Sequence, residues 1–263
     1  LQKTLIYADR GVIYDRNEVP LVWNTTNPDL PDYSLRVYAS STGLSTILGY
    51  VKYPTKDSSG KYYQEMFDPK DGLEKIYNEE ISGRDGTRII ETDVRGNIIS
   101  ESVVDQTVDG QNIVLSIDSK LQKRLSESLL DIADRAGYKG GAGVIMDVRT
   151  GEILASSNFP EYESGVMTDG SNKEKINSWL NSSSHPFLNR VISGLYTPGS
   201  IMKIFFAMGV LDQGVIDPNK QILSTGSISI PNPFFPDKPS VFMDWKAHGL
   251  VDLRRAIAVS SNV

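Results

Sequence analysis

A serine and a lysine three residues apart, Ser200 and Lys203, could perform nucleophilic chemistry in this 263-residue sequence. On a helix, this spacing places two side chains on one face, within about 5 to 6 Å of each other. A serine attacks well only when a base takes its proton, and a lysine can be that base when burial or a nearby cation lowers its pKa. The surrounding segment 196–211 is apolar on nearly every face, which predicts a buried helix that supplies the burial. Ser200 would lie at the start of this helix, where unpaired backbone N–H groups and the helix dipole favour an oxyanion.

The short patterns involved are not specific by themselves, because the sequence contains each of them twice. The Ser-x-x-Lys spacing recurs at Ser58 and Lys61, in a polar segment typical of a turn. A Ser-x-Asn pattern occurs at Ser156 and Asn158, at the end of a predicted hairpin. The functional interpretation of Ser200 therefore needs support from elsewhere in the chain.

That support comes from a second Ser-x-Asn pattern, formed by Ser260 and Asn262. It ends a short amphipathic segment, 253–262, that is typical of a helix. Ser-x-x-Lys followed by Ser-x-Asn and then by Lys-Thr-Gly marks penicillin-binding proteins and class A β-lactamases. The sequence contains the first two of these motifs in that order and ends at Val263 without the third.

Composition narrows the possible partners and cofactors. The formal net charge is −6 and the pI is about 5.1, and Lys and Arg do not cluster, which argues against a nucleic-acid partner. There is no cysteine and there are only two histidines, His185 and His248, so disulfides and thiolate zinc sites are excluded and little remains for a histidine metal site. The longest apolar run, 204–211, is far shorter than the roughly 20 residues of a membrane helix. Because the sequence begins with Leu1, we expect it to be part of a longer chain.

The elements that must position these residues are predicted to be mainly strands at first, and then helices and strands together. From Asp118 to Gly137 a helix is expected, because Asp118 is a good N-cap and leucines recur at three- and four-residue steps. The predicted fold class is α+β. The other expected elements are strands within 4–23, a loop at 24–33, a strand at 48–51, a helix at 71–77, strands at 87–92, 97–104 and 113–117 around turns at 95–97 and 109–110, a hairpin of strands 141–148 and 153–156, and a long polar stretch at 161–184.

Taken in order along the chain, these patterns resemble the class B penicillin-binding proteins, and among them the elongation-type members. The likeness runs nearly from end to end. The motifs that carry it are Arg10-Gly11-Val12-Ile13-Tyr14-Asp15-Arg16-Asn17, Leu48-Gly49-Tyr50-Val51, Gly72-Leu73-Glu74, Gly83-x-x-Gly86, Glu91-x-Asp93-x-x-Gly96, Asp109-Gly110, Leu115-Ser116-Ile117-Asp118, Leu121-Gln122, Asn189-Arg190, Pro198-Gly199-Ser200-x-x-Lys203, Asp244-Trp245-Lys246 and His248-Gly249.

The resemblance implies two domains and a cellular setting. Residues 1–111 would be a shortened, mainly β, non-catalytic pedestal of the dimerisation type, and residues 112–263 the N-terminal part of a transpeptidase domain with the fold shared by penicillin-binding proteins and serine β-lactamases. The protein would work on the extracytoplasmic face of the bacterial cell membrane, anchored by an N-terminal helix outside this sequence. A membrane glycosyltransferase of the elongation machinery is the protein partner that the resemblance implies.

The resemblance also assigns roles to individual residues. Ser200 would be the acylated nucleophile, Lys203 its base, Ser260 the proton relay to the leaving group, and Asn262 a contact to the substrate amide and to Lys203. The reaction would be D,D-transpeptidation: the D-Ala-D-Ala end of a peptidoglycan stem peptide acylates the serine, and an amine of a neighbouring stem takes the acyl group. β-Lactams would inhibit it, and no metal or organic cofactor is implied.

Two departures from the family pattern qualify these expectations. The Lys-Thr-Gly strand would normally contact the substrate carboxylate and supply an oxyanion donor, so we expect the 263-residue chain by itself to be inactive. Between Asn17 and Leu35 the chain is shorter than the family pattern, and Glu18 replaces a glycine, so we expect a head subdomain to be absent.

Two other functions remain open from the sequence. The protein could be a β-lactamase, or a non-catalytic homologue that senses β-lactams or acts as a scaffold for a glycosyltransferase. The pedestal motifs speak against a β-lactamase. His248 is expected to be a satisfied structural histidine rather than a catalytic one.

Overall fold

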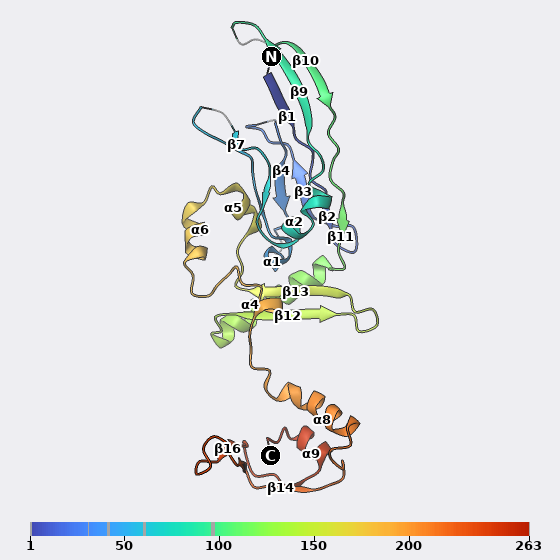
Figure 1. Ribbon diagram of the computed structural model, residues 1–263, viewed down its shortest axis with the longest axis vertical. Coiled ribbons are helices and arrows are strands. Elements are labelled where there is room, and N and C mark those ends of the chain that lie inside the picture. Colours follow the sequence, from blue (N-terminus) through green and yellow to red (C-terminus); the bar gives the residue numbers. More distant parts are fainter. Residues whose placement is uncertain (1, 31, 41–42, 60–61, 96–97, 263) are drawn as a thin grey trace. The chain divides into compact units, whose positions relative to one another are not determined.

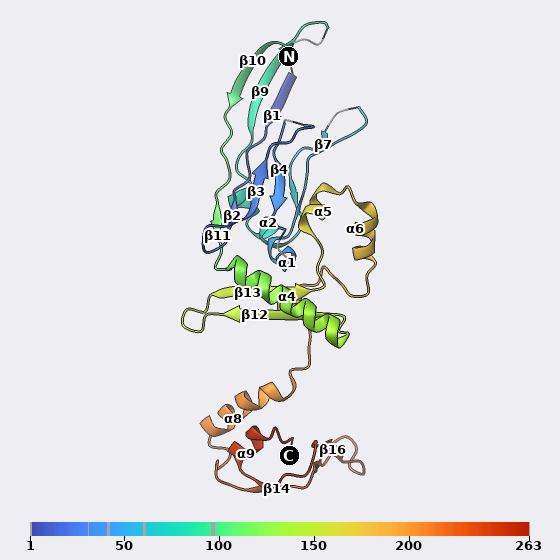
Figure 2. The same ribbon diagram turned by 180° about the vertical axis from the view of Figure 1, so that it is seen from behind.

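The computed structural model describes residues 2–30, 32–40, 43–59, 62–95 and 98–262. It contains both helices and strands, which confirms the predicted α+β class. The chain forms two compact units, Leu1–Gly194 and Leu195–Val263, and each is described by itself (Figure 1 and Figure 2). The expected domain boundary between residues 111 and 112 stays a prediction.

Two β-sheets form the first part of the N-terminal unit. One is antiparallel with the order β1-β9-β10, and the other has the order β11-β2-β3-β4, with β11 parallel to β2. Two small sheets pair β5 with β8 and β6 with β7. The bounds are β1 Gln2–Ile6, β2 Ile13–Tyr14, β3 Pro20–Thr25, β4 Leu35–Tyr38, β5 Val51–Lys52, β6 Thr55–Lys56, β7 Tyr62–Gln64, β8 Asp68–Pro69, β9 Gly86–Thr92, β10 Ile98–Asp105 and β11 Ile113–Val114. The prediction of a β-rich opening with a β9–β10 hairpin is therefore confirmed.

The segment predicted as a strand at 48–51 is mostly a helix end and a turn. Leu48 ends helix α1 (Ser45–Leu48), Gly49 has a φ of 73°, and only Val51 enters a strand. A Cβ at Gly49 would lie 1.7 Å from the carbonyl oxygen of Asp71, so no side chain fits where these two backbones meet. The apolar character of the segment reflects burial of Leu48 and Val51 and does not mark a continuous strand.

The remaining predictions for this part have mixed outcomes. The helix expected at 71–77 forms as α2 (Gly72–Ile76) and continues, after Tyr77, as α3 (Asn78–Ile81). Gly96 and Asn97 of the expected turn, and Lys61 of the second Ser-x-x-Lys copy, lie outside the described residues.

Glu18 occupies a turn position whose backbone conformation favours glycine. Its φ of 60° lies in the left-handed region, which costs a residue with a Cβ roughly 1 to 2 kcal/mol. The carboxylate of Asp15 holds this turn, because its Oδ1 accepts hydrogen bonds from the backbone N–H groups of Asn17 (2.7 Å) and Val19 (2.9 Å).

A buried ion cluster around Glu74 joins three parts of the pedestal sequence. Glu74 Oε2 lies 2.8 Å from Nη2 of Arg10, and Oε1 lies 2.7 Å from Nε of Arg36. The three side chains are at most 3% exposed. Arg36 also donates to the carbonyl oxygen of Gly11 at 2.8 Å. Because a carboxylate removed from water must be hydrogen-bonded or paired with opposite charge, this cluster holds β4, α2 and the Arg10-Gly11 motif together.

Helix α4 (Ser119–Ala136) begins as predicted after Asp118. The Asp118 carboxylate accepts hydrogen bonds from the backbone N–H groups of Lys120 (3.0 Å) and Leu121 (3.1 Å), which satisfies two donors that a helix start leaves unpaired. The helix ends at Gly137, which adopts the left-handed conformation.

Helix α4 packs on a β-hairpin, and three helices follow it. The hairpin is formed by β12 and β13, as predicted. The polar stretch 161–184 contains two helices that the sequence did not predict, because their few apolar residues give a weak helical period. The bounds are β12 Gly141–Met146, β13 Ile153–Phe159, α5 Ser164–Asp169, α6 Lys173–Leu180 and α7 Arg190–Ser193.

Buried polar side chains connect this second part of the unit to the pedestal sequence. Asp15 is fully buried and accepts hydrogen bonds from Oγ (2.7 Å) and the backbone N–H (3.1 Å) of Ser119. Gln122 is also fully buried, and its Nε2 donates to the carbonyl oxygens of Gly43 and, at 2.8 Å, of Ser156. Its Oε1 accepts a hydrogen bond from the backbone N–H of Ser156, also at 2.8 Å. These hydrogen bonds fix the start of α4 to the part of the chain predicted as the pedestal.

Glu161 makes a further connection of this kind, and it titrates near neutrality. Burial is the main reason why its pKa is raised from 4.5 to about 7, because the charged form loses its hydration. The carboxylate accepts hydrogen bonds from the backbone N–H groups of Gly43 and Ser45, which oppose the rise, while Glu163 adds to it.

The C-terminal unit contains two helices, a 3₁₀ turn and two small antiparallel sheets, in which β14 pairs with β17 and β15 pairs with β16. Helix α9 confirms the predicted amphipathic helix from Leu253, but it ends at Ala258, so Ser260 and Asn262 lie beyond it. The bounds are η1 Gly199–Met202, α8 Lys203–Asp212, β14 Ile222–Ser224, β15 Ser227–Ile230, β16 Ser240–Met243, β17 Gly249–Val251 and α9 Leu253–Ala258.

The apolar helix at the candidate nucleophile differs from its prediction in start and in burial. Ser200 lies in the 3₁₀ turn η1, and α8 begins only at Lys203. Within α8, Ala207 is the buried residue, whereas Ile204 is 55% and Phe206 66% exposed. The prediction of a buried helix is wrong for this structure, because the described elements of the unit cover only part of the surface of α8. Among the described residues, no helix is both long and apolar enough to cross a membrane.

Replacing Glu74 with glutamine should destabilise the chain by on the order of 3 kcal/mol, because two guanidinium groups would remain buried without a counter-charge. Chemical denaturation of Glu74→Gln and of the parent chain measures this. Glu79→Gln, an exposed position on α3, is the control and should stay within about 0.5 kcal/mol of the parent. Equal unfolding free energies for Glu74→Gln and the parent would contradict the structural role of the cluster.

The raised pKa of Glu161 predicts a pH dependence of stability. Since the folded chain favours the protonated acid, the contribution of this group is fully present below about pH 4.5 and is lost as the pH rises through about 7. The loss should be on the order of 3 kcal/mol. Glu161→Gln lacks this titration, so the difference in unfolding free energy between variant and parent should change across that window.

Urea denaturation at several pH values tests this expectation. Glu174→Gln, at an exposed position on α6, is the matched control and should follow the parent at every pH. A difference between Glu161→Gln and the parent that stays constant from pH 4 to 8 would show that Glu161 does not titrate in this range.

Candidate active site

The side-chain nitrogen of Lys203 binds three oxygen atoms of the segment that follows α9. Nζ lies 2.7 Å from the carbonyl oxygen of Ser260, 3.3 Å from Ser260 Oγ and 2.7 Å from Oδ1 of Asn262. Lys203 is the first residue of α8, so these bonds join the start of one helix to the end of the other. Three of the four residues predicted from the sequence therefore meet in one place.

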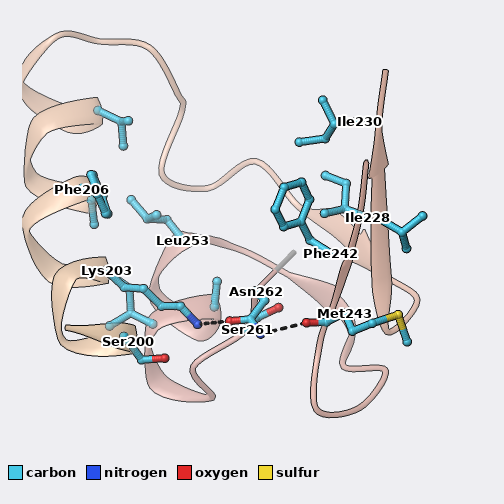
Figure 3. A pocket seen from close by; sticks show the side chains of 16 residues that line it. Ser200, Lys203, Phe206, Ile228, Ile230, Phe242, Met243, Leu253, Ser261 and Asn262 are labelled. Carbon is cyan, nitrogen blue, oxygen red and sulfur yellow. Dashed lines mark hydrogen bonds between the residues drawn. The ribbon is translucent and has the colours of Figure 1, made fainter. Parts of the chain in front are cut away.

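Ser200, the fourth predicted residue, lies in the turn before Lys203 and is exposed. It lines the same cavity as Lys203 and Asn262, and Figure 3 shows it next to Lys203 on one wall. Within the described part of the chain, no hydrogen bond joins Ser200 to Lys203. The hydroxyl group and the amine thus share a cavity wall without a hydrogen bond between them, and the hydroxyl group is open to a molecule in the cavity.

The cavity has a volume of about 870 Å³ and changes in character from one side to the other. Its polar end contains Ser200, Lys203 and Asn262, and its other walls are mostly apolar, with Phe206 on α8 and Phe242 on β16 facing it (Figure 3). A mostly apolar concave site with a few convergent polar groups suits a small molecule or a peptide end.

The second copies of the two short motifs have structural roles or lie outside this site. Asn158 on β13 is 2% exposed; its Nδ2 donates to Oγ1 of Thr46 at 2.7 Å, and its Oδ1 accepts from the backbone N–H of Val191 at 3.1 Å. Ser58 lies in a turn. Lys61, the lysine of that copy, lies outside the described residues.

His248 is buried but not fully satisfied. Its side chain is 2% exposed and lies edge-on to Trp245, with ring centroids 4.9 Å apart. Nε2 lies 3.7 Å from Oδ1 of Asp244 and makes no hydrogen bond. The expectation of a satisfied histidine is therefore wrong, although the side chain is positioned as part of the structure. Among the described residues, no group of three or more His, Asp or Glu side chains could hold a metal ion.

Asp244 is a residue of the site to which the sequence alone assigns no role. It is the first residue of the Asp-Trp-Lys motif, and its side chain is fully buried. Its carboxylate accepts hydrogen bonds from Ser261 and Asn262, the two residues that follow Ser260 in the sequence. The Asp-Trp-Lys motif could have drawn attention to Asp244. The separation of Asp244 and Ser261 in the sequence does not indicate that they are in contact.

Two family models match successive parts of the chain. The model described as a penicillin-binding protein dimerisation domain matches residues 31–115, and the model described as a penicillin-binding protein transpeptidase domain matches residues 141–263. The first range contains the Glu74 cluster, and the second contains the Lys203 site. The chain therefore belongs to the class B penicillin-binding proteins.

Within this family the similarity is to elongation-type members, as the sequence motifs predicted. The chain is 32% identical over 241 residues to the peptidoglycan D,D-transpeptidase MrdA of Haemophilus influenzae. That match covers 88% of this chain and 35% of the relative, so the chain spans about a third of the length of the curated protein.

Solved structures share the fold. A chain from a structure titled "Structural coordination of polymerization and crosslinking by a peptidoglycan synthase complex" matches with a TM-score of 0.75 and 24% identity, covering 99% of this chain and 56% of that chain. A chain from a complex between penicillin-binding protein 2 and MreC of Helicobacter pylori gives a TM-score of 0.74 at 21% identity, covering 99% and 61%. The expected fold, a pedestal followed by part of a transpeptidase domain, is confirmed.

Proposed function

We propose that the protein is a peptidoglycan D,D-transpeptidase of cell-wall elongation that works through a serine acyl-enzyme and is inhibited by β-lactams. The observation that carries this proposal is the binding of Lys203 Nζ to Ser260 and Asn262 at the wall of the cavity that Ser200 lines. The transpeptidase-domain match over residues 141–263 and the identity to MrdA support it.

In the proposed first step, Ser200 Oγ attacks the carbonyl carbon between the two D-alanines of a stem peptide. The bond to the terminal D-alanine breaks, the peptide remains on Ser200 as an ester, and D-alanine leaves after gaining a proton. In the second step, an amine of a neighbouring stem attacks the ester, forms the crosslink and returns the proton to Ser200.

Lys203 is proposed as the base and Ser260 as the relay. A neutral lysine amine has two N–H donors and one lone pair. The donors can remain on the Ser260 carbonyl oxygen and on Asn262 Oδ1, both 2.7 Å from Nζ, which leaves the lone pair for a hydroxyl proton. Ser260 Oγ lies 3.3 Å from Lys203 Nζ, close enough to receive that proton and relay it to the leaving amine.

Asn262 is proposed to contact the substrate amide, because its side chain lies at the cavity wall beside Lys203. Apolar walls opposite the polar end would hold the aliphatic part of the stem peptide or the body of a β-lactam. The residues of the chain provide acid–base and nucleophilic groups for each step, so the proposal involves no metal or organic cofactor.

The setting of the reaction is part of the proposal. Following the family resemblance, we place the site on the extracytoplasmic face of the cell membrane, with an anchor helix outside this sequence. A membrane glycosyltransferase of the elongation machinery is the proposed protein partner. The match to a chain from a structure described as a peptidoglycan synthase complex supports that choice.

The alternatives are less well supported. A β-lactamase has no need of the dimerisation domain that matches residues 31–115. A β-lactam sensor or scaffold would form a stable acyl-enzyme without crosslinking stem peptides, which a crosslinking assay distinguishes from the proposed activity.

Treatment of the complete protein with a penicillin should add one adduct, located on Ser200. Ser200→Ala should lose it, because the acceptor oxygen is gone. Intact-mass spectrometry followed by peptide mapping measures both. Ser58→Ala, the other copy of the Ser-x-x-Lys spacing, is the control and should be labelled like the parent. An adduct on Ser200→Ala would refute the assignment of the nucleophile.

The 263-residue polypeptide, produced as such, should show little or no penicillin labelling, because it lacks the Lys-Thr-Gly strand that would contact the β-lactam carboxylate. The same mass measurement, at equal concentrations of this polypeptide and of the complete protein, tests this. Stoichiometric labelling of the shorter polypeptide would mean that the strand is dispensable for acylation.

A further inference from the structure

We propose that Asp244 is a positioning residue for the transpeptidation reaction, because its buried carboxylate holds the Ser260–Asn262 segment in the backbone conformation that brings it to Lys203. This inference rests on the proposed function for its catalytic consequence. The hydrogen bonds on which it is based lie within the C-terminal unit.

The segment begins with a strained helix end. After α9, the backbone N–H of Ser260 bonds to the carbonyl oxygen of Ile257 at 3.1 Å, and that of Ser261 bonds to Ala256 at 2.9 Å. This pair of bonds is the Schellman arrangement, in which the residue after the cap is left-handed and is usually glycine. Here that residue is Ser260, with a φ of 55°.

A serine at this position has a cost that glycine avoids. The left-handed conformation brings Cβ close to the backbone and is disfavoured for residues with a side chain. Such a conformation persists only where surrounding contacts over-determine it. Since the proposed relay needs a hydroxyl group at Ser260, the strain cannot be removed by glycine, and additional contacts must hold the turn.

Asp244 provides those contacts directly after the strained residue. Oδ2 accepts a hydrogen bond from Ser261 Oγ at 2.5 Å and another from the backbone N–H of Asn262 at 3.0 Å. Its Oδ1 accepts from the backbone N–H of Trp245 at 2.8 Å, which fixes the orientation of the carboxylate itself. The side chain is fully buried, so water does not compete for these bonds.

The neighbours of Asp244 add two more bonds to the same segment. Trp245 Nε1 donates to the carbonyl oxygen of Val259 at 3.0 Å, and Asn262 Nδ2 donates to the carbonyl oxygen of Met243 at 3.0 Å. Figure 3 shows Asn262 between Lys203 and Met243, with one hydrogen bond to each. Residues 243–245 therefore bind both the backbone and the side chains of residues 259–262.

The carboxylate is charged under the conditions of the reaction. Burial alone would raise the pKa of Asp244, but hydrogen bonds from Ser261, Trp245 and Asn262 and the proximity of His248 outweigh it and lower the pKa to about 2. A charged acceptor forms shorter and stronger hydrogen bonds than a neutral one, in agreement with the 2.5 Å bond from Ser261. Asp244 does not line the cavity, so it acts through the segment and not on the substrate.

Asp244→Asn tests the proposal, because it keeps the size of the side chain but replaces one acceptor oxygen by a donor. In the complete protein we expect the first-order rate of penicillin acylation at saturation to fall about 10- to 100-fold, since a small misplacement of reacting groups has effects of this size. The dissociation constant of the unreacted penicillin should stay within about 2-fold. Stopped-flow acylation over a range of penicillin concentrations separates the two quantities.

A second measurement does not depend on activity. Hydrogen exchange of peptides containing Asn262, followed by mass spectrometry, should be roughly 10-fold faster in Asp244→Asn, because the backbone N–H of Asn262 loses a charged acceptor. Asp237→Asn, in an exposed loop of the same unit, should match the parent in acylation and in exchange. Agreement of all three results with these expectations supports the positioning role.

Other outcomes overturn it. Parent-like acylation and exchange in Asp244→Asn would show that the carboxylate does not hold the segment. A fall in acylation rate, affinity and unfolding temperature together would show a general structural role. If Asp244→Asn does not fold, Ser261→Ala removes the hydroxyl group that donates to Oδ2, and parent-like acylation together with parent-like exchange of Asn262 there overturns the proposal. If the parent is not labelled at all, the proposed function fails, and the exchange measurement alone decides whether Asp244 holds the segment.

Discussion

The N-terminal unit depends on the burial of one carboxylate. Glu74 can leave water only because Arg10 and Arg36, from separate parts of the chain, bring their guanidinium groups to its two oxygens. With these side chains in place, the adjacent backbones must approach closely, and a Cβ at Gly11 would lie 1.8 Å from the carbonyl oxygen of Gln111. Charge pairing and close backbone contacts therefore explain how motifs scattered over residues 10–111 meet in one region. In the C-terminal unit, the buried carboxylate of Asp244 is instead satisfied by hydrogen bonds from Ser261 and Asn262.

The elements that the sequence predicted correctly have causes within a few residues. Asp118 caps α4 through donors two and three positions later, and the hairpin of β12 and β13 follows from a turn between two apolar runs. The incorrect predictions involve distant partners. The strand expected at 48–51 does not form, because the backbone at Gly49 packs closely against the backbone of Asp71. Helix α8 is exposed because the other described elements of its unit cover only part of its surface.

The candidate site divides in the same way. Its four predicted residues came from motifs and from a family resemblance, and the structure brings Lys203, Ser260 and Asn262 together and places Ser200 at the same cavity. The contacts between these residues could not be predicted from the sequence. No local pattern indicates that the carboxylate of Asp244 would face Ser261, seventeen positions further on, or that Nε2 of His248 would be buried without a hydrogen bond.

The backbone of Ser260 sets stability against function at a single position. A glycine there would relieve the strain of a φ of 55° and would suit the end of α9, so it would be the more stable residue for the fold. It would also remove the hydroxyl group that Lys203 Nζ approaches. Selection for stability alone would favour glycine at this position, whereas selection for proton transfer retains serine. The strained end of α9 is therefore a stability–activity trade-off.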